Sequence, residues 1–320
     1  MIGSVPDTAL IVVLVVLIAD GVLSGLPGLR RLLDLPEVMI RSLARWFDEK
    51  LNRIRRGRGA VRLQGAIVAI VVAAIAGAAG YGLETLARQI SHSEFFYVGA
   101  ILFLLGLRRP VDAMRSGDDS RAANRAASLV RFDVPEDDRH AIARAAVEGG
   151  AARIVEGLFA TVFWFLVLGL PGSFVHCGLG AAADAIGRSS PRHSDFGFAV
   201  ARLNDVLSLP GALIARPVVS IAALFCPGAR SARAIVGWLR DLAARGITEG
   251  YRAEGAVAGA LGLAPGGPRL FDGDAVAGSW IYNGRVRVEV ADVRRAIYLL
   301  AIAALLVGLS VALASVSVAR

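Results

Sequence analysis

The sequence is poor in lysine and cysteine, and each scarcity excludes a class of protein. Lys50 is the only lysine in 320 residues, so the phosphate-binding loop G-x-x-x-x-G-K-[ST] is absent and Schiff-base chemistry is not expected. Any phosphate group must be bound by arginine or by backbone amides. Cys177 and Cys226 stand alone without a C-x-x-C pair, which excludes a disulfide framework and a structural zinc site.

Catalytic motifs built on histidine or serine are also missing. The four histidines form no H-E-x-x-H pattern, and no G-x-S-x-G is present. The sequence therefore gives no sign of a zinc protease or of a hydrolase with a serine nucleophile.

Apolar residues are abundant instead. The hydrophobic share is 55% and the mean hydropathy is +0.59, above the roughly 45–50% apolar content of a soluble domain. The net charge of +8 comes mainly from arginines in polar stretches between apolar runs, where basic residues set membrane topology. We therefore expect a lipid bilayer as partner and no nucleic acid.

The apolar runs predict a polytopic, mainly α-helical bundle that forms a single integral-membrane domain over residues 1–320. The expected apolar segments are about 8–29, 63–83, 95–107, 157–175, 206–226 and 297–318. The first basic residue, Arg30, follows the first segment, which is expected to remain as an anchor. The arginine-rich stretches 30–62, 108–156 and 227–296 are predicted to face the cytoplasm of a bacterial inner membrane.

Proline and glycine interrupt two of these segments. Pro171-Gly172 and Pro210-Gly211 favour broken or re-entrant helices, because irregular backbone at membrane depth survives only where protein or a wet cavity covers it. Two ordinary spans with frayed ends are the alternative. Small residues in the second segment, Ala73, Gly77 and Gly80, are expected to let another helix approach closely.

The polar stretches carry their own patterns. Residues 38–54 place apolar side chains at helical spacing, which predicts a basic amphipathic helix either on the membrane surface or packed on the protein itself. Ser231 is expected to cap a helix ending at Gly246. Further on, W-I-Y-N-G-R-V-R-V predicts a β-hairpin that turns at Asn283-Gly284.

Several charged residues lie beside or within apolar segments. An ionisable side chain at membrane depth usually marks a working site. Arg202 and Asp205 are three residues apart and directly precede an apolar run, so they share a helical face and are expected to pair. Alternatively, both lie at the interface with their charged ends in water. Asp20 similarly interrupts the first apolar segment.

Three stretches of the sequence carry a family resemblance. The first is F-G-F-A-V-A-R-L-N-D-V at 196–206, the second A-V-E-G-G-A-A-R-I-V-E-G-L-F-A-T-V-F-W at 146–164, and the third A-V-A-G-A-L-G-L at 256–263. In their order along the chain they resemble the adenosylcobinamide-phosphate synthase family of late cobalamin biosynthesis. Some family positions differ: its histidine-proline pair is Leu35-Pro36 here, and its Glu-Asn pair is Ala152-Arg153.

The resemblance implies an ATP- and Mg²⁺-dependent ligase that joins adenosylcobyric acid to aminopropanol or its phosphate, with other membrane proteins of the cobalamin pathway as further partners. It implies catalytic roles for Glu148, Glu156, Asp184 and Asp205, with Glu148 and Asp205 as Mg²⁺ ligands. It also implies substrate-binding roles for Asp20, Arg202, Asn204 and Glu254, with Arg202 on phosphate.

Two other functions remain open at this stage. The altered motif positions favour a non-catalytic membrane paralogue with a regulatory or assembly role. A transporter is the third option, although no inverted repeat relates the two halves. For the enzyme, Asp184 and Arg202 must face the same side as Glu148, which predicts that at least one segment among 157–175 and 206–226 does not cross the membrane completely.

Overall fold

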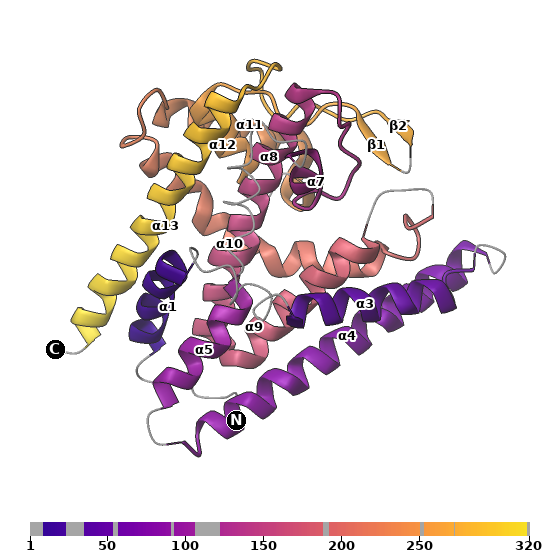
Figure 1. The fold of residues 1–320 in the computed structure, drawn as a ribbon, viewed down its shortest axis with the longest axis vertical. Coiled ribbons are helices and arrows are strands. Elements are labelled where there is room, and N and C mark those ends of the chain that lie inside the picture. Colours follow the sequence, from indigo (N-terminus) through magenta and orange to yellow (C-terminus); the bar gives the residue numbers. More distant parts are fainter. Residues whose placement is uncertain are drawn as a thin grey trace. The chain divides into compact units, whose positions relative to one another are not determined.

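The computed structural model describes residues 9–23, 35–53, 57–90, 93–105, 122–187, 192–249, 253–271 and 273–318. Helices make up most of this part of the chain, together with one two-stranded sheet (Figure 1). The chain divides into two compact units. The first consists of Met1–Gly106, Ala160–Ser208 and Gly308–Arg320, and the second of Leu107–Phe159 and Leu209–Val307.

Each unit contains its own set of helices. The first unit contains α1 (Ala9–Leu23), α3 (Leu35–Leu51), α4 (Arg58–Ala87), α5 (Ser93–Leu105), α9 (Thr161–Ile186) and the beginning of α10 (Phe198–Ala222). The second contains the rest of α10, α7 (Ala122–Ala127), α8 (Arg139–Ile154), a π-helix (Val155–Ala160), α11 (Ser231–Glu249), α12 (Glu254–Leu261), β1 (Arg269–Phe271), β2 (Asp274–Val276) and most of α13 (Val290–Val318).

Long apolar helices confirm the predicted fold class, a mainly α-helical membrane protein. Among the residues described, four helical stretches are long and apolar enough to cross a membrane: Arg58–Ala87, Arg139–Ile186, Phe198–Ala222 and Val290–Ala314. The helices α1 and α5 are apolar but shorter. The predicted segments 63–83 and 297–318 correspond to α4 and α13.

The first unit is built on the contact between α4 and α9, with α3 packed against both helices. Its core gathers small and branched apolar side chains such as Val68, Val72 and Ala182. The predicted role of the small residues in α4 is confirmed at two positions. A methyl group at Gly80 would lie 2.7 Å from Cα of Pro171, and one at Gly77 would lie 3.2 Å from Val175.

A real helix break lies in α9, as the first proline-glycine pair predicts. Gly169 has φ 68° and ψ −154°, which takes the backbone out of the helix two residues before Pro171. The carboxylate of Glu84, on α4, accepts a hydrogen bond of 3.0 Å from the backbone N–H of Leu170, and its other oxygen pairs with Arg88 at 2.8 Å. Glu84 is only 3% exposed, so it serves as a buried acceptor for the interrupted backbone.

The second predicted break is wrong. Pro210 and Pro217 both lie inside α10, which continues from Phe198 to Ala222. Near this point the indole of Trp164 donates a 2.7 Å hydrogen bond to the carbonyl of Leu207. Because Pro210 has no N–H, the carbonyl that lacks its helical donor is that of Val206, the neighbour of Leu207.

Helix α3 packs on its own protein along one face. Ala44 and Asp48 are buried there, whereas Met39 and Trp46 on the opposite face are more than half exposed. At its C-terminal end, the Asp48 carboxylate accepts a hydrogen bond of 3.0 Å from Arg192 and lies 3.3 Å from Nε2 of His193.

Burial alone would raise the pKa of Asp48. Hydrogen bonds from His193 and Asn52, with the charges of His193 and Arg192, outweigh burial and hold this pKa below its ordinary value. Residues 192–193 are therefore fastened to α3 by an ionised carboxylate.

In the second unit, α11 and α12 pack with their backbones almost in contact. A methyl group at Gly259 would lie 2.1 Å from the carbonyl oxygen of Arg233, and one at Gly237 would lie 2.2 Å from that of Gly255. The α11 helix runs to Glu249, so the predicted stop at Gly246 is wrong.

The sheet also differs from the prediction. β1 pairs antiparallel with β2, with Phe271 opposite Asp274, so the hairpin turns about ten residues before Asn283-Gly284. At Gly284 a methyl group would lie 2.5 Å from the carbonyl oxygen of Gly262. This glycine therefore permits a close backbone approach, not a hairpin turn.

Candidate functional site

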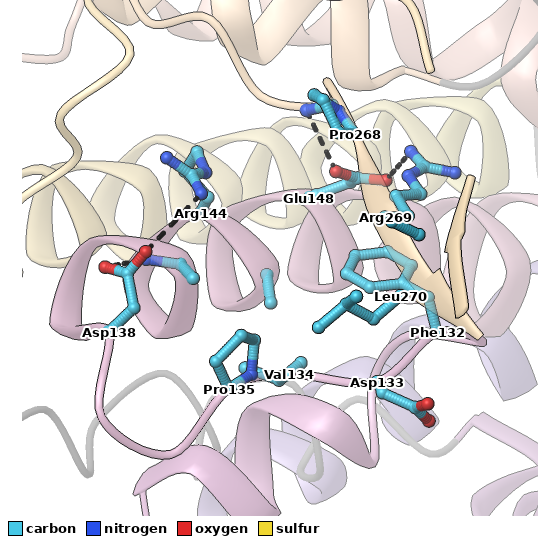
Figure 2. Close-up of a pocket in the computed structure, with 14 residues that line it drawn as sticks. Phe132, Asp133, Val134, Pro135, Asp138, Arg144, Glu148, Pro268, Arg269 and Leu270 are labelled. Atoms are coloured by element: carbon cyan, nitrogen blue, oxygen red, sulfur yellow. Dashed lines mark hydrogen bonds and ion pairs between the residues drawn. The ribbon is translucent and has the colours of Figure 1, made fainter. Parts of the chain in front are cut away.

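A hollow of about 180 Å³ lies beside α8 in the second unit (Figure 2). One face of α8 forms its wall with side chains at helical spacing, namely Asp138, Ala141, Arg144, Ala145 and Glu148. The opposite wall comes from the segment 132–135, from residues 266 and 268–270, and from residue 275. Asp138 begins the helix, because its carboxylate accepts hydrogen bonds from the N–H groups of His140 and Ala141.

Glu148, one of the expected catalytic residues, forms part of this wall. Its carboxylate is 5% exposed and accepts a hydrogen bond from the guanidinium of Arg269, and a second one of 3.1 Å from the N–H of Gly266. Arg269 also lies over the ring of Phe132, with 4.8 Å between Cζ and the ring centroid. Glu148 thus holds the 265–269 segment beside the hollow.

Arg144 is held much more loosely on the other side of the hollow. Its guanidinium lies 3.9 Å from Asp138, 3.5 Å from the carbonyl of Val286 and 5.8 Å from the centre of the Trp280 ring. The hollow therefore has an ion pair on each of two sides, Arg144 with Asp138 and Arg269 with Glu148 (Figure 2). Arg269 and Arg144 were not predicted; the D-x-x-A-x-x-R-A-x-x-E spacing at 138–148 is the signal that marks this face.

Glu156 lies at the second position of the π-helix that follows α8. Single π-helical turns inside α-helices are rare and are frequent at functional sites. Two guanidiniums approach this carboxylate, that of Arg153 at 3.5 Å and that of Arg131 at 3.7 Å. Glu156 therefore lies between two positive charges, one from the helix that carries it and one from Arg131.

Glu254 is the first residue of α12 and is 3% exposed. The neighbouring part of this unit contains two other buried charged side chains, Asp241 of α11 and Arg216 of α10. Arg216 lies over the ring of Trp238, 5.9 Å from its centroid. Glu254 therefore belongs to a buried environment, in which charged groups are usually paired or functional.

In the first unit, Asp184 of α9 accepts a hydrogen bond of 2.9 Å from Arg41 of α3. Arg41 also pairs with Glu37, one turn earlier on the same helix. The carboxylate of Asp184 is only 6% exposed. Arg41 thus fixes the direction in which Asp184 points.

The predicted pair at the start of α10 is confirmed. Nη1 of Arg202 lies 3.9 Å from Oδ2 of Asp205, and the guanidinium also lies 5.6 Å from the centroid of Phe198. Asn204 is fully buried, and its Oδ1 is 3.3 Å from where a methyl group at Gly180 would be. Asn204 therefore faces α9, whereas Arg202 and Asp205 reach the surface.

The structure divides the expected site residues between the two units. Glu148, Glu156 and Glu254 belong to the second unit, and Asp184, Arg202, Asn204 and Asp205 to the first. The backbone of Asp20 belongs to α1, and its side chain lies outside the described part of the chain. The catalytic and substrate-binding roles of these residues stay predictions.

The two expected Mg²⁺ ligands, Glu148 and Asp205, belong to different units. Over the described ranges, no three histidine, cysteine, aspartate or glutamate side chains gather where they could hold a metal ion. The two expected ligands each face an arginine, Glu148 in contact with Arg269 and Asp205 with Arg202 at 3.9 Å. These residues do not fit a protein-bound Mg²⁺, and we assign no chemical step to one.

Comparison with known proteins places the chain among cobalamin biosynthesis proteins. The family model described as CobD/Cbib protein matches residues 14–300. A cobalamin biosynthesis protein CobD of Rhizobium meliloti is 30% identical over 298 residues, covering 90% of this chain and 91% of the relative. Its counterpart in Brucella melitensis is 28% identical over 325 residues, covering 95% and 99%. No solved structure matches.

Proposed function

The chain belongs to the CobD/CbiB family of cobalamin biosynthesis proteins, and on this premise we propose that it joins a carboxylate of adenosylcobyric acid to aminopropanol or its phosphate, with ATP as co-substrate. The observation that carries this proposal is the hollow beside α8, where Glu148, which matches the family pattern, lies with two guanidiniums. The site is assigned to the cytoplasmic side of a bacterial inner membrane.

Amide formation from a carboxylate requires activation. An oxygen of the corrinoid carboxylate attacks the terminal phosphorus of ATP, the bond from that phosphorus to the bridging oxygen breaks, and ADP leaves. The product is an acyl phosphate. The amine nitrogen then attacks its carbonyl carbon, the bond to phosphate breaks, and a carboxylate base accepts the proton from nitrogen.

Arginine has the chemistry that this reaction needs, since phosphoryl charge is stabilised by fixed cations and the chain has almost no lysine. Arg202 is half-exposed at the start of α10, with Asp205 beside it. We assign Arg202 to phosphate and Asp205 to the proton from the amine. Asn204 and Glu254 are assigned to substrate positioning.

Ion pairing favours a second candidate, a non-catalytic paralogue with a regulatory or assembly role. Glu148, Glu156 and Asp184 each lie beside an arginine of the same unit, namely Arg269, Arg153 and Arg41. Such pairs also occur as purely structural contacts.

Complementation separates the two candidates. The protein would be produced in a cobalamin auxotroph that lacks its own synthase, and growth scored on adenosylcobyric acid with and without cobinamide. We expect growth without cobinamide, and loss of that growth in Asp205→Ala, because the base is removed while the membrane helices remain. If the protein reaches the membrane and only cobinamide restores growth, the paralogue is correct. Full activity of Asp205→Ala removes this residue from the site.

A further inference from the structure

We propose that the outward face of α3 is a lipid-contact surface, and that this helix enters the bilayer with its N-terminal half while its C-terminal end stays at the level of the headgroups. The partner is the membrane itself, with acyl chains against the apolar half and phosphates against the basic end. This contact goes beyond the proposed reaction, and its test requires no catalytic activity.

The first half of α3 exposes apolar side chains on one face. Leu35, Val38 and Met39 are 49%, 51% and 69% exposed. They are three and four residues apart, so they share the side of the helix that points away from the buried Ala44. A contiguous exposed apolar patch marks a contact with a membrane or with another protein. The neighbours of α3 favour the membrane.

Those neighbours are two helices that are candidates to cross the bilayer. Helix α3 packs against α4 and α9 (Figure 1), and both belong to stretches long and apolar enough for a span. The three helices meet at Gly178 of α9. A methyl group there would lie 2.9 Å from Cβ of Ala76 on α4 and 3.4 Å from Cδ1 of Ile40 on α3. Ile40 therefore lies at the level of Ala76.

The basic residues of α4 convert this level into a depth. Arg58 and Arg62 lie in the first turns of α4, and both pair with Asp195, at 3.0 Å and 2.8 Å. At 1.5 Å per residue, Ala76 lies about 21 Å along the helix from Arg62. The hydrocarbon core of a bilayer is about 30 Å thick. With the arginines at the headgroups and α4 crossing the core, Ile40 lies well inside the hydrocarbon.

The polarity of α3 follows the same gradient. Its second half exposes Arg45 and Lys50, Arg53 is exposed just after the helix, and Glu49 is the acidic residue exposed among them. Trp46 is 52% exposed beside Arg45. Tryptophan and basic side chains are typical of the membrane–water interface. The C-terminal end of α3 therefore suits the headgroups, and the N-terminal end suits the acyl chains.

The polar groups near the start of α3 are compatible with membrane depth. Arg41 pairs with Glu37 and donates a 2.9 Å hydrogen bond to Asp184, and ionisable groups at this depth pair with one another. Pro36 is the second residue of the helix. It has no N–H, which removes one of the donors that the first turn leaves without an intrahelical acceptor. Both features lower the cost of placing this end in hydrocarbon.

Spin labelling of the full-length protein in vesicles of phosphatidylethanolamine and phosphatidylglycerol tests the proposal. Each variant carries one nitroxide on an introduced cysteine, with Cys177 and Cys226 replaced. Collisions of the label with oxygen, which concentrates in the bilayer, are compared with its collisions with a water-soluble nickel chelate. We expect the oxygen-to-nickel ratio to be severalfold higher in Met39→Cys than in Glu49→Cys. Equal ratios at the two positions would reject a helix that enters the bilayer with one end.

Two reference positions calibrate the ratio. Ile70→Cys, at a 65% exposed position of α4, represents lipid, and Glu136→Cys, exposed before α8, represents water. Met39→Cys and, measured in parallel, Val38→Cys should resemble Ile70→Cys. A ratio like that of Glu136→Cys would place this face in water and overturn the proposal. Protection from both reagents would also overturn it, because a second copy or another protein would then cover the face. A water-like ratio at Ile70→Cys would remove α4, and α3 with it, from the bilayer.

Discussion

At the scale of single residues, Glu84 is a buried carboxylate, only 3% exposed, that serves an interrupted backbone. It accepts the N–H of Leu170 at the break in α9 and pairs with Arg88. We expect Glu84→Ala to lower the stability of the protein by about 1–3 kcal/mol, because a buried N–H loses its acceptor. Glu84→Gln keeps an acceptor oxygen and should lose less.

Thermal unfolding in detergent measures this difference, with Glu49→Ala, at an exposed position of α3, as the control. An unfolding temperature in Glu84→Ala equal to that of the control would show that the N–H of Leu170 has another acceptor.

Asp48 gives the contact between α3 and residues 192–193 a pH dependence. The pKa of Asp48 is lowered in the folded protein. The ionised carboxylate therefore stabilises the folded state fully above the ordinary aspartate pKa of about 4, and this stabilisation is lost as the pH falls below that value. We expect proteolysis near residues 192–195 to accelerate below about pH 4 in the wild type, as measured between pH 3 and 6.

The neighbouring Asp195 titrates in the same direction. Hydrogen bonds from Arg58, and then from Arg62, lower its pKa. Asp48→Asn therefore isolates the contribution of Asp48: the variant should be cleaved faster than the wild type at pH 6 and should change less with pH. An identical pH profile for both proteins would assign the effect to Asp195.

The distance along the chain decides which residue contacts the sequence could predict. Arg202 and Asp205 are three residues apart, and helical geometry alone brings them together. Glu84 meets Leu170 across 86 positions, and Arg41 meets Asp184 across 143. No local pattern encodes such pairs, because they depend on how α3 and α4 pack against α9.

At the scale of elements, the close contact between α11 and α12 leaves no room for a side chain at its glycine positions. Gly259→Ala would place a methyl group 2.1 Å from a backbone carbonyl, so the helices must separate. We expect a loss of stability of about 1–3 kcal/mol or more, in the range measured for overpacked cores. The change in thermal unfolding temperature would be compared with that of Gly59→Ala.

Gly59 is the appropriate control, because it is helical and a methyl group there meets no atom within 4 Å. Alanine favours helix over glycine by up to about 1 kcal/mol, so Gly59→Ala should be neutral or stabilising. Equal destabilisation by both substitutions would mean that helix propensity, not close packing, governs position 259.

Helices were predicted correctly where the apolar runs are long. Breaks and turns were predicted wrongly where a glycine or proline is compatible with more than one backbone conformation. The apolar runs located α4 and α13, and Pro171 located the break in α9. Pro210 marks no break, and Gly284 serves a close backbone approach to Gly262 instead of a turn. The π-helix that contains Glu156 follows α8 without a proline or a cap residue that would mark it in the sequence.

At the scale of the whole molecule, the membrane topology is the main prediction still to be tested. The proposed reaction requires Asp184 and Arg202 to reach the cytoplasmic side. We expect a cysteine introduced at Ser189, which lies outside the described residues, to resist a membrane-impermeant maleimide in intact spheroplasts and to react after permeabilisation.

The background for this labelling needs both native thiols, Cys177 and Cys226, replaced, since neither forms a disulfide. Labelling of Ser189→Cys from the outside of intact spheroplasts would contradict the cytoplasmic assignment of Asp184 and Arg202.

The broken helix has a consequence for how the chain is made. An N–H without an acceptor costs several kcal/mol in hydrocarbon. The acceptor for Leu170 is on α4, which leaves the ribosome before α9. Because α4 is synthesised first, Glu84 is already in the bilayer when the interrupted helix α9 is inserted. In a rearranged gene that encoded α9 before α4, the N–H of Leu170 would enter the membrane without its acceptor.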